Sequence, residues 1–205
     1  MADLTFYTNP RSRGAGVRSM PEEVGAPYAT VLMEFGEPMQ ADWFRDLNPM
    51  AKVPVLRHGS QVVTETAAIC VCLADAFPDA RLAPAPDSRS AHFRWLMFFA
   101  GPLEAAVTDR ALGLEVPAER RGMVGSGDCE RTVAALEGAV STTPFLAGEV
   151  FTAADADVGS QVGCGLRFGT LPDRPALRDF WSRLEARPAQ RRAAELDMLA
   201  QKEMP

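Results

Sequence analysis

The residues with the clearest capacity for chemistry stand at the start of the chain, where Ser12 lies between two arginines in the segment FYTNPRSRGAG. A serine hydroxyl can cap a helix, attack a carbonyl carbon, or donate a hydrogen bond to an anion. The two glycines at positions 14 and 16 also suggest a loop that binds phosphate. Each of these uses requires different neighbouring residues, so the rest of the sequence decides between them.

Two of these uses are excluded by residues that the sequence lacks. A phosphate loop needs G-x-x-x-x-G-K-[ST] or G-x-G-x-x-G, whereas Gly14 and Gly16 supply only the first half of the second pattern. Nucleophilic attack by Ser12 needs a histidine base, and neither His58 nor His92 stands in a recognisable nucleophile motif. A helix cap and a site that handles a thiol remain. The segment has no C-x-x-C, which argues against disulfide exchange.

Two further segments have residue types suited to an amino-acid-like ligand. Pro54 interrupts an apolar run and is either an edge-strand or strand-start proline, or a cis-proline that leaves the Val53 main chain free to pair with a peptide. Glu65 and Thr66 stand where a strand pattern gives way to a helix pattern. Thr66 either caps this helix or binds a carboxylate there, while Glu65 receives an ammonium group.

The acidic pair and the cysteines elsewhere are better explained by structure than by chemistry. Thr152-x-x-Asp155 matches a capping box with Phe151 as a hydrophobic staple, so Asp155 is expected to determine the fold and not to catalyse. The cysteines have no spacing typical of metal ligands, and we expect no metal site and four reduced thiols: Cys70, Cys72, Cys129 and Cys164.

Composition and charge limit the kinds of protein and of partner that fit this sequence. The chain has 205 residues, of which 47% are hydrophobic and 23% charged, enough to form a buried core in one or two domains. With 27 acidic and 21 basic residues its net charge is −6, which argues against a nucleic-acid partner. We find no signal-peptide pattern and no apolar run near the roughly 18 residues that span a bilayer. These features predict a cytoplasmic protein without a membrane partner.

The elements that must position these residues follow from periodicity. The first part alternates strand and helix patterns in the order βαβαββα, and residues 78–88, rich in proline and small residues, mark its end. Only helical patterns follow. We therefore predict an α/β domain over residues 1–78, a linker over 79–88 and an all-α helical bundle over 89–205. The helices of the bundle are expected near residues 91–112, 128–140, 152–168, 175–187 and 189–202.

Pro21 complicates the helix expected over residues 12–24. A proline inside a helix removes a hydrogen bond and clashes with the preceding turn, at a cost of roughly 3 kcal/mol. Either this helix is kinked, or its regular part begins near Pro21, which would move its N-terminus away from Ser12.

Four of these motifs, in this order, resemble those of the cytosolic glutathione transferases, especially bacterial members with an active-site serine or cysteine. The resemblance extends over essentially the whole chain and implies a thioredoxin-like N-terminal domain, an all-α C-terminal domain, a homodimer and a role in detoxification. The motifs are FYTNPRSRG, NPMAKVPVL, VVTETAAICVCLADAFP and FTAADADVGSQV.

The resemblance also implies that glutathione is the co-substrate, with no other cofactor. It places Ser12 where the family has its thiol-activating group, with Tyr7 as the second candidate, and the charges of Arg11 and Arg13 favour a thiolate there. For glutathione it implies a further set of binding residues: Glu65 and Thr66 for the γ-glutamyl end, Val53 before cis-Pro54 for the cysteinyl backbone, and Lys52 for the glycyl carboxylate.

The activity that these roles imply is conjugation of the glutathione thiolate to a small hydrophobic electrophile. Two alternatives stay open: a non-catalytic module that binds glutathione or another protein, and a glutathione-dependent reductase or dehalogenase. For the electrophile pocket the candidates are Arg94, Phe98 and Phe99 on the first helix of the bundle, with core packing as the alternative for the two phenylalanines.

Overall fold

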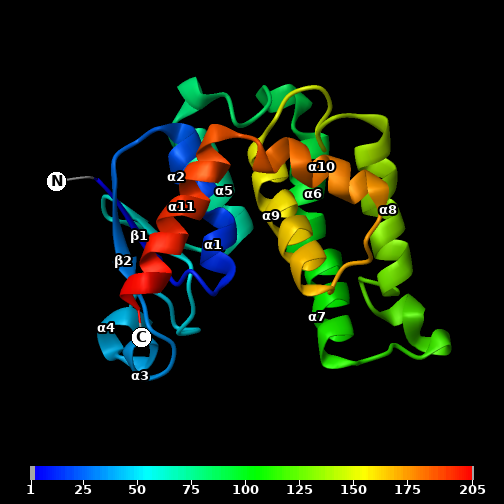
Figure 1. Ribbon diagram of the computed structural model, residues 1–205, viewed down its shortest axis with the longest axis horizontal. Helices are drawn as coiled ribbons and strands as arrows, with labels where there is room; N and C mark the ends of the chain where they lie inside the picture. Colours follow the sequence, from blue (N-terminus) through cyan, green and yellow to red (C-terminus); the bar gives the residue numbers. More distant parts are fainter. Residues whose placement is uncertain (1–2, 205) are drawn as a thin grey trace. The chain divides into compact units, whose positions relative to one another are not determined.

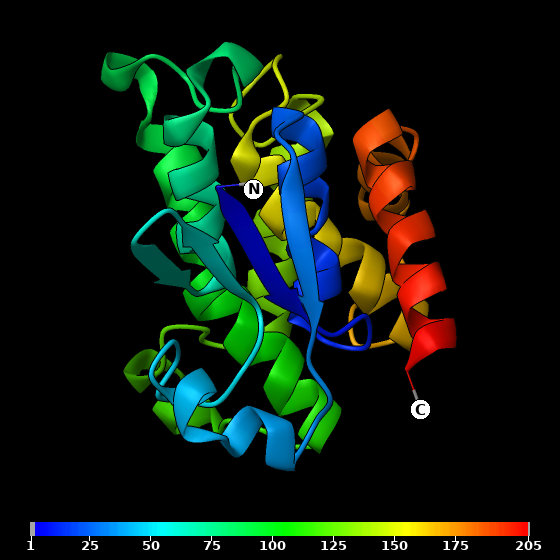
Figure 2. The same cartoon turned by 90° about the vertical axis from the view of Figure 1, so that its left-hand side faces the viewer.

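A four-stranded mixed sheet forms the centre of the N-terminal part of the computed structural model, which describes residues 3–204. The strands lie in the order β2-β1-β3-β4; β1 is parallel to β2 and antiparallel to β3, and β3 and β4 form an antiparallel hairpin (Figure 2). All five residues of β1, an interior strand, are buried. The strands are β1 (Leu4–Thr8), β2 (Tyr28–Leu32), β3 (Val55–His58) and β4 (Gln61–Thr64).

Helices connect these strands as expected, so the βαβαββα order is confirmed. Two short helices stand between β1 and β2, two between β2 and β3, and a longer one follows β4. They are α1 (Arg13–Val17), α2 (Ser19–Val24), α3 (Glu37–Gln40), α4 (Asp42–Arg45) and α5 (Thr66–Ala76), after which come the short 3-10 turns Pro78–Ala80 and Pro86–Ser88.

The helix expected over residues 12–24 is broken between α1 and α2. Pro21 is the third residue of α2, and Val17, four residues earlier, ends α1. Because Pro21 has no N–H to donate to the Val17 carbonyl, the helix breaks at this turn. Of the two expected arrangements, a helix that begins near Pro21 is not observed: α1 begins directly after Ser12, and the helix is interrupted at Arg18.

The chain forms two compact units, residues 1–82 with 186–205, and residues 83–185. Helix α11 (Pro188–Glu203) packs on α2 and α1 of the first unit (Figure 1). The helix pattern of residues 189–202 predicted a member of the helical domain, whereas the contacts of α11 join it to the first unit. Its buried residues, Ala193, Asp197 and Ala200, lie along one face of the helix.

The second unit is all-helical. Its central helix, α9, begins at the predicted capping box: the Asp155 carboxylate accepts hydrogen bonds from Thr152 N (2.8 Å) and Leu146 N (2.7 Å), and the structural role of Asp155 is confirmed. The helices are α6 (Ser90–Phe98), α7 (Glu104–Leu112), α8 (Cys129–Thr142), α9 (Ala153–Phe168) and α10 (Pro175–Glu185), with a π-helical turn at Phe99–Leu103 between α6 and α7 and a 3-10 turn at Ala118–Met123.

Within residues 3–204, no helix combines the length and the apolar character needed to cross a membrane. The same residues contain no group of three or more histidine, cysteine or acidic side chains arranged to hold a metal ion.

Candidate functional site

The strand register brings the three predicted binding segments to one edge of the sheet. Tyr7, Val55 and Thr64 lie in one row across β1, β3 and β4. Because β3 runs antiparallel to both neighbours, the end of β1, the start of β3 and the end of β4 lie at the same edge. The turn after β1, the segment before β3 and the start of α5 after β4 are therefore neighbours.

Ser12 is the N-cap residue of α1, with extended backbone angles. Its hydroxyl accepts a hydrogen bond from Gly14 N (2.9 Å) and donates one to the Asn9 carbonyl (2.7 Å). The helix cap predicted as one alternative for Ser12 is thus present. The residue is half-buried, so part of its surface is open to a ligand.

Asn9, which the sequence analysis did not select, organises this turn. Its side chain is buried, donates from Nδ2 to the Met33 carbonyl (2.8 Å) and accepts at Oδ1 from Arg11 N (2.8 Å). The signal that could have found it is the Asn-Pro pair, because an asparagine that bonds the main chain two residues on is typical of turns.

Gly14 has a packing role instead of the phosphate-binding role excluded above. A Cβ atom at this position would lie 2.1 Å from Thr8 Oγ1 and 3.1 Å from Ser12 Oγ. A side chain here would therefore push α1 away from β1 and displace the Ser12 cap.

Tyr7, the second candidate for thiol activation, lies in the hydrophobic core of the first unit. Its side chain belongs to a cluster of buried residues, and its ring centroid lies 6.2 Å from that of Phe44 and 6.4 Å from that of Trp43. The other buried members of the cluster are Met33, Met39 and Val55.

The Val53–Pro54 peptide bond is cis, as the cis-proline interpretation predicted. The segment before it is held by Asn48, whose side chain donates to the Lys52 carbonyl (2.7 Å) and accepts from Met50 N (3.0 Å). Among residues 3–204, no hydrogen bond involves the Val53 main chain. Val53 thus has a free amide and carbonyl next to the sheet edge, and the Lys52 side chain is exposed.

Glu65, and not Thr66, occupies the N-cap position of α5; Thr66 is the first helical residue. No side chain caps this helix, so the alternative that Thr66 is an ordinary N-cap is wrong. The first helical hydrogen bond runs from Ile69 N to the Glu65 carbonyl (2.9 Å), which leaves the preceding N–H groups without intrahelical partners. Glu65 also has a φ of +67°, a strained value that is frequent at ligand-binding sites.

The two arginines of the first turn flank Ser12: Arg11 is exposed, and Arg13 is half-buried as the first residue of α1. The electrophile-pocket candidates belong to the second unit. Arg94 is exposed and stacks on the Trp95 ring, with 4.4 Å from Cζ to the ring centroid, and Phe98 is half-buried. Phe99 is 2% exposed, so its side chain forms part of the core, the alternative given for the phenylalanines.

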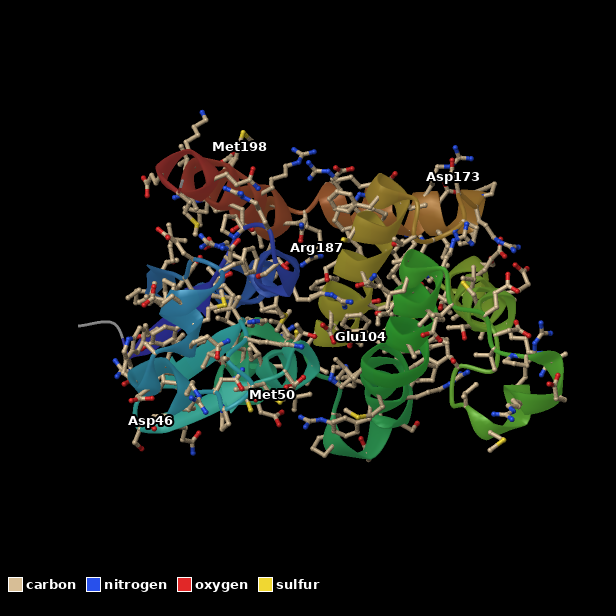
Figure 3. The ribbon with its side chains drawn as sticks, turned by 90° about the horizontal axis from the view of Figure 1, so that it is seen from below. Asp46, Met50, Glu104, Asp173, Arg187 and Met198 are labelled. Atoms are coloured by element: carbon tan, nitrogen blue, oxygen red, sulfur yellow. The ribbon has the colours of Figure 1, made fainter. Side chains whose placement is uncertain are left out.

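A surface hollow elsewhere in the first unit contains none of the predicted site residues. It is formed by α4 and the turn that follows, and Asp46, which is labelled in Figure 3, is one of its lining residues. Its lining is mostly charged: Asp42, Arg45, Asp46 and Pro49.

Comparison with known proteins first identifies the N-terminal region. Residues 14–76 match the family model of the glutathione S-transferase N-terminal domain. A curated relative, Protein LigF of Sphingobium sp. (strain NBRC 103272 / SYK-6), is 43% identical over 56 residues, which are 26% of this chain. The match spans only 22% of that relative's length.

Solved structures match over nearly the whole chain. A glutathione transferase from Methylococcus capsulatus str. bath aligns with a TM-score of 0.80 at 22% identity, covering 96% of this chain and 99% of the other. The theta class enzyme of Xanthomonas axonopodis pv. citri, with glutathione bound, gives 0.75 at 25% identity, covering 95% and 98%. URE2P6 from Phanerochaete chrysosporium, in complex with oxidized glutathione, gives 0.81 at 23% identity, covering 97% and 98%. The expected fold, a thioredoxin-like domain followed by a helical domain, is confirmed.

Proposed function

We propose, from the premise that this chain belongs to the glutathione transferase family by its N-terminal domain and its fold, that it conjugates glutathione to a small hydrophobic electrophile. The observation that supports this proposal is the strand register, which brings together the end of β1, the start of β3 and the end of β4. Ser12, Val53 and Thr66 belong to the segments that adjoin these three strand ends. A tripeptide bound along this edge can contact all three segments at once.

The γ-glutamyl end of glutathione carries an ammonium and a carboxylate on one carbon, and the start of α5 suits both. The exposed Glu65 side chain can pair with the ammonium. The Thr66 hydroxyl and the uncapped N–H groups of α5 can donate to the carboxylate. A capped helix would have used these donors internally, so the lack of a side-chain cap supports this assignment.

The rest of the tripeptide extends towards the turn after β1. The free Val53 amide and carbonyl can pair with the cysteinyl main chain, as an added strand pairs with a sheet edge. The cis-Pro54 peptide follows directly, and the exposed Lys52 side chain can attract the glycyl carboxylate. The cysteinyl sulfur then lies near Ser12.

Activation of the sulfur requires that the site stabilise the negative charge of the thiolate. A free thiol has a pKa of roughly 8.5, and lowering it by two units requires about 2.7 kcal/mol of preferential thiolate stabilisation. A hydroxyl that donates to a charged acceptor contributes about 1.5–3 kcal/mol, so the Ser12 hydroxyl can supply much of this. Arg11 and Arg13 favour the anion further. Ser12 is preferred to Tyr7 because the Tyr7 side chain packs among apolar residues.

The thiolate then attacks the electrophile by displacement or by addition to an activated double bond. Arg94 and Phe98 stay the candidates for contact with the electrophile, whereas the buried Phe99 can act only by supporting them. A homodimer in the cytoplasm with a role in detoxification is the corresponding proposal for the whole protein.

One observation favours a second candidate, a module that binds glutathione without activating it. The Ser12 hydroxyl already has both a donor and an acceptor within the protein. If it keeps the Asn9 carbonyl as its acceptor when glutathione is bound, no hydrogen bond to sulfur forms.

Ultraviolet titration of bound glutathione separates the two candidates, because the thiolate absorbs and the thiol does not. We expect thiolate absorbance at neutral pH in the wild type and its loss in Ser12→Ala, with glutathione affinity unchanged within about threefold, less than 1 kcal/mol. Asp128→Ala, which removes the N-cap of α8 in the other unit, is the control for loss of a cap. A wild type without thiolate absorbance supports the binding module, and a larger loss in Tyr7→Phe than in Ser12→Ala refutes the Ser12 assignment.

A further inference from the structure

In the turn after β1, the Ser12 hydroxyl donates to an acceptor that it can leave at low energetic cost. The Asn9 carbonyl accepts two hydrogen bonds from Ser12, one from the hydroxyl (2.7 Å) and one from the main-chain N–H (3.0 Å). If the hydroxyl turns away, the carbonyl keeps the N–H as its donor. A buried acceptor without any partner, which is the expensive outcome, is therefore avoided.

The same turn also keeps the hydroxyl polarised. Gly14 N donates to Ser12 Oγ at 2.9 Å, and this bond is kept in both hydroxyl rotamers whose hydrogen points away from Gly14 N. A hydroxyl that accepts a hydrogen bond becomes a better donor through the same oxygen.

The Asn9 side chain holds this arrangement in place from both sides. Its Nδ2 donates to the Met33 carbonyl, just after β2, and its Oδ1 accepts from Arg11 N, both at 2.8 Å. Met33 is itself bound to β1 through its N–H and the Thr8 carbonyl (2.9 Å). The Asn9 amide thus ties the Pro10–Ser12 turn to both parallel strands.

We propose that Asn9 is a positioning residue for the Ser12 hydroxyl, an inference that rests on the proposed function. With the site empty, the Asn9 carbonyl accepts the hydroxyl hydrogen. When glutathione is bound, the hydroxyl rotates and donates to the sulfur, while the Asn9 side chain keeps Ser12 Oγ in place. No proton leaves Ser12 in this exchange, and Asn9 acts only through Ser12.

The test measures the pKa of the bound glutathione thiol and, separately, the affinity for S-methylglutathione, which has no ionisable sulfur. We expect Asn9→Ala to raise the pKa of the bound thiol by about one unit, which lowers the thiolate fraction at neutral pH about threefold, with S-methylglutathione affinity within about threefold of the wild type. In the Ser12→Ala background, Asn9→Ala should cause no further change in the thiol pKa, because two residues that act as one unit are not additive.

Asn48→Ala is the matched control, because Asn48 is also a buried asparagine that holds a turn through two hydrogen bonds. It is expected to weaken S-methylglutathione binding through the Lys52–Val53 segment and to leave the thiol pKa unchanged. Should Asn9→Ala fail to fold, Asn9→Ser serves instead: its hydroxyl can accept from Arg11 N but cannot reach the Met33 carbonyl. We expect it to shift the thiol pKa in the same direction by a smaller amount.

Either of two results would overturn the role of Asn9 without affecting the proposed function. One is a lowered thiol pKa in the wild type that the Asn9 variants retain. The other is a pair of thiol pKa shifts, in Asn9→Ala and Ser12→Ala, that add in full. A wild type whose bound thiol titrates at its ordinary pKa overturns the proposed function itself and the inference with it.

Discussion

Removing the Asp197 carboxylate should unfold the first unit at much lower denaturant concentration. Arg18 Nε lies 2.9 Å from Asp197 Oδ1, and the two side chains are only 2% and 10% exposed. The guanidinium also lies over the Phe6 ring, 5.9 Å from its centroid. Without Asp197 this arginine remains buried with no opposite charge in contact, because the nearby Glu22 carboxylate is bound to the Tyr28 hydroxyl at 2.5 Å.

The expected cost of Asp197→Ala is about 3–5 kcal/mol, the range for breaking a buried ion pair by removing one partner. The double variant Arg18→Met/Asp197→Leu should regain most of this, since an apolar pair of similar volume avoids the desolvation of two charges. Arg192→Ala is the matched control on the same helix. Its partner Glu195 is 3.6 Å away and both side chains are more than half exposed, so we expect a change below about 0.5 kcal/mol.

The assay is urea unfolding of the full chain with Trp43 as the reporter of the first unit, in a background where Trp95 and Trp181 of the second unit are replaced by phenylalanine. Local reporting is needed because a chain of two units need not unfold in one step. If Asp197→Ala and Arg192→Ala lowered the unfolding free energy equally, burial of an ion pair would not determine its contribution to stability.

The ion pair also predicts a pH dependence. Burial raises the pKa of Asp197 from 3.8 to about 6, although the Arg18 charge opposes this. A raised carboxyl pKa means that the folded state binds the proton more tightly, and the protonated carboxyl, unlike an alanine, still places an oxygen beside Arg18. The contribution of Asp197 to stability is therefore greatest below pH 4 and falls as the pH rises through 6. Relative to Asp197→Asn, the wild type should gain on the order of 1 kcal/mol of unfolding free energy as the pH falls from 7 to 5. A difference that does not vary with pH would contradict the raised pKa.

Three further predictions concern the site and its supports. Ala51 has a φ of +54°, so Ala51→Gly should raise the unfolding free energy by about 0.5–1 kcal/mol in urea titrations, and a loss of stability would show that the alanine side chain has a role of its own. Gly14→Ala should lower it by about 1–3 kcal/mol because of the contact with Thr8 Oγ1, and adding Thr8→Ala should restore part of the loss; without such recovery the clash is not the cause. Glu65→Ala should raise the calorimetric Kd for glutathione at least about tenfold with the bound thiol pKa unchanged, and an unchanged Kd would overturn the γ-glutamyl assignment.

The features that the sequence predicted well are those whose physical cause is local. The capping box at Asp155 needs only four consecutive residues, and the break near Pro21 follows from one missing N–H. The cis bond at Pro54 was predicted as one of two alternatives, and only the strand register showed that it lies at the same sheet edge as Ser12.

The features that were missed depend on contacts between distant parts of the chain. The pattern of residues 188–203 indicates a helix but not which unit it packs against, and the partner of Asp197 is an arginine near the other end of the sequence. Asn9 was missed because its importance arises from the Met33 carbonyl, which only the parallel pairing of β1 and β2 brings close. The predicted N-cap of α5, Thr66, was wrong by one position. The N-cap is Glu65, whose strained backbone (φ +67°) starts the helix.

The packing of α11 on the first unit has a consequence for the order of events during synthesis. A ribosome synthesises residues 83–185, a continuous segment, before α11, so the second unit has all of its residues while the first still lacks a helix. Until residues 186–203 emerge, Arg18 has no carboxylate partner and the face of α2 that α11 covers is open to solvent. The unit that begins the chain is thus the second to be completed, and chaperones that bind exposed surface on nascent chains have their longest access to the half that holds the proposed glutathione site.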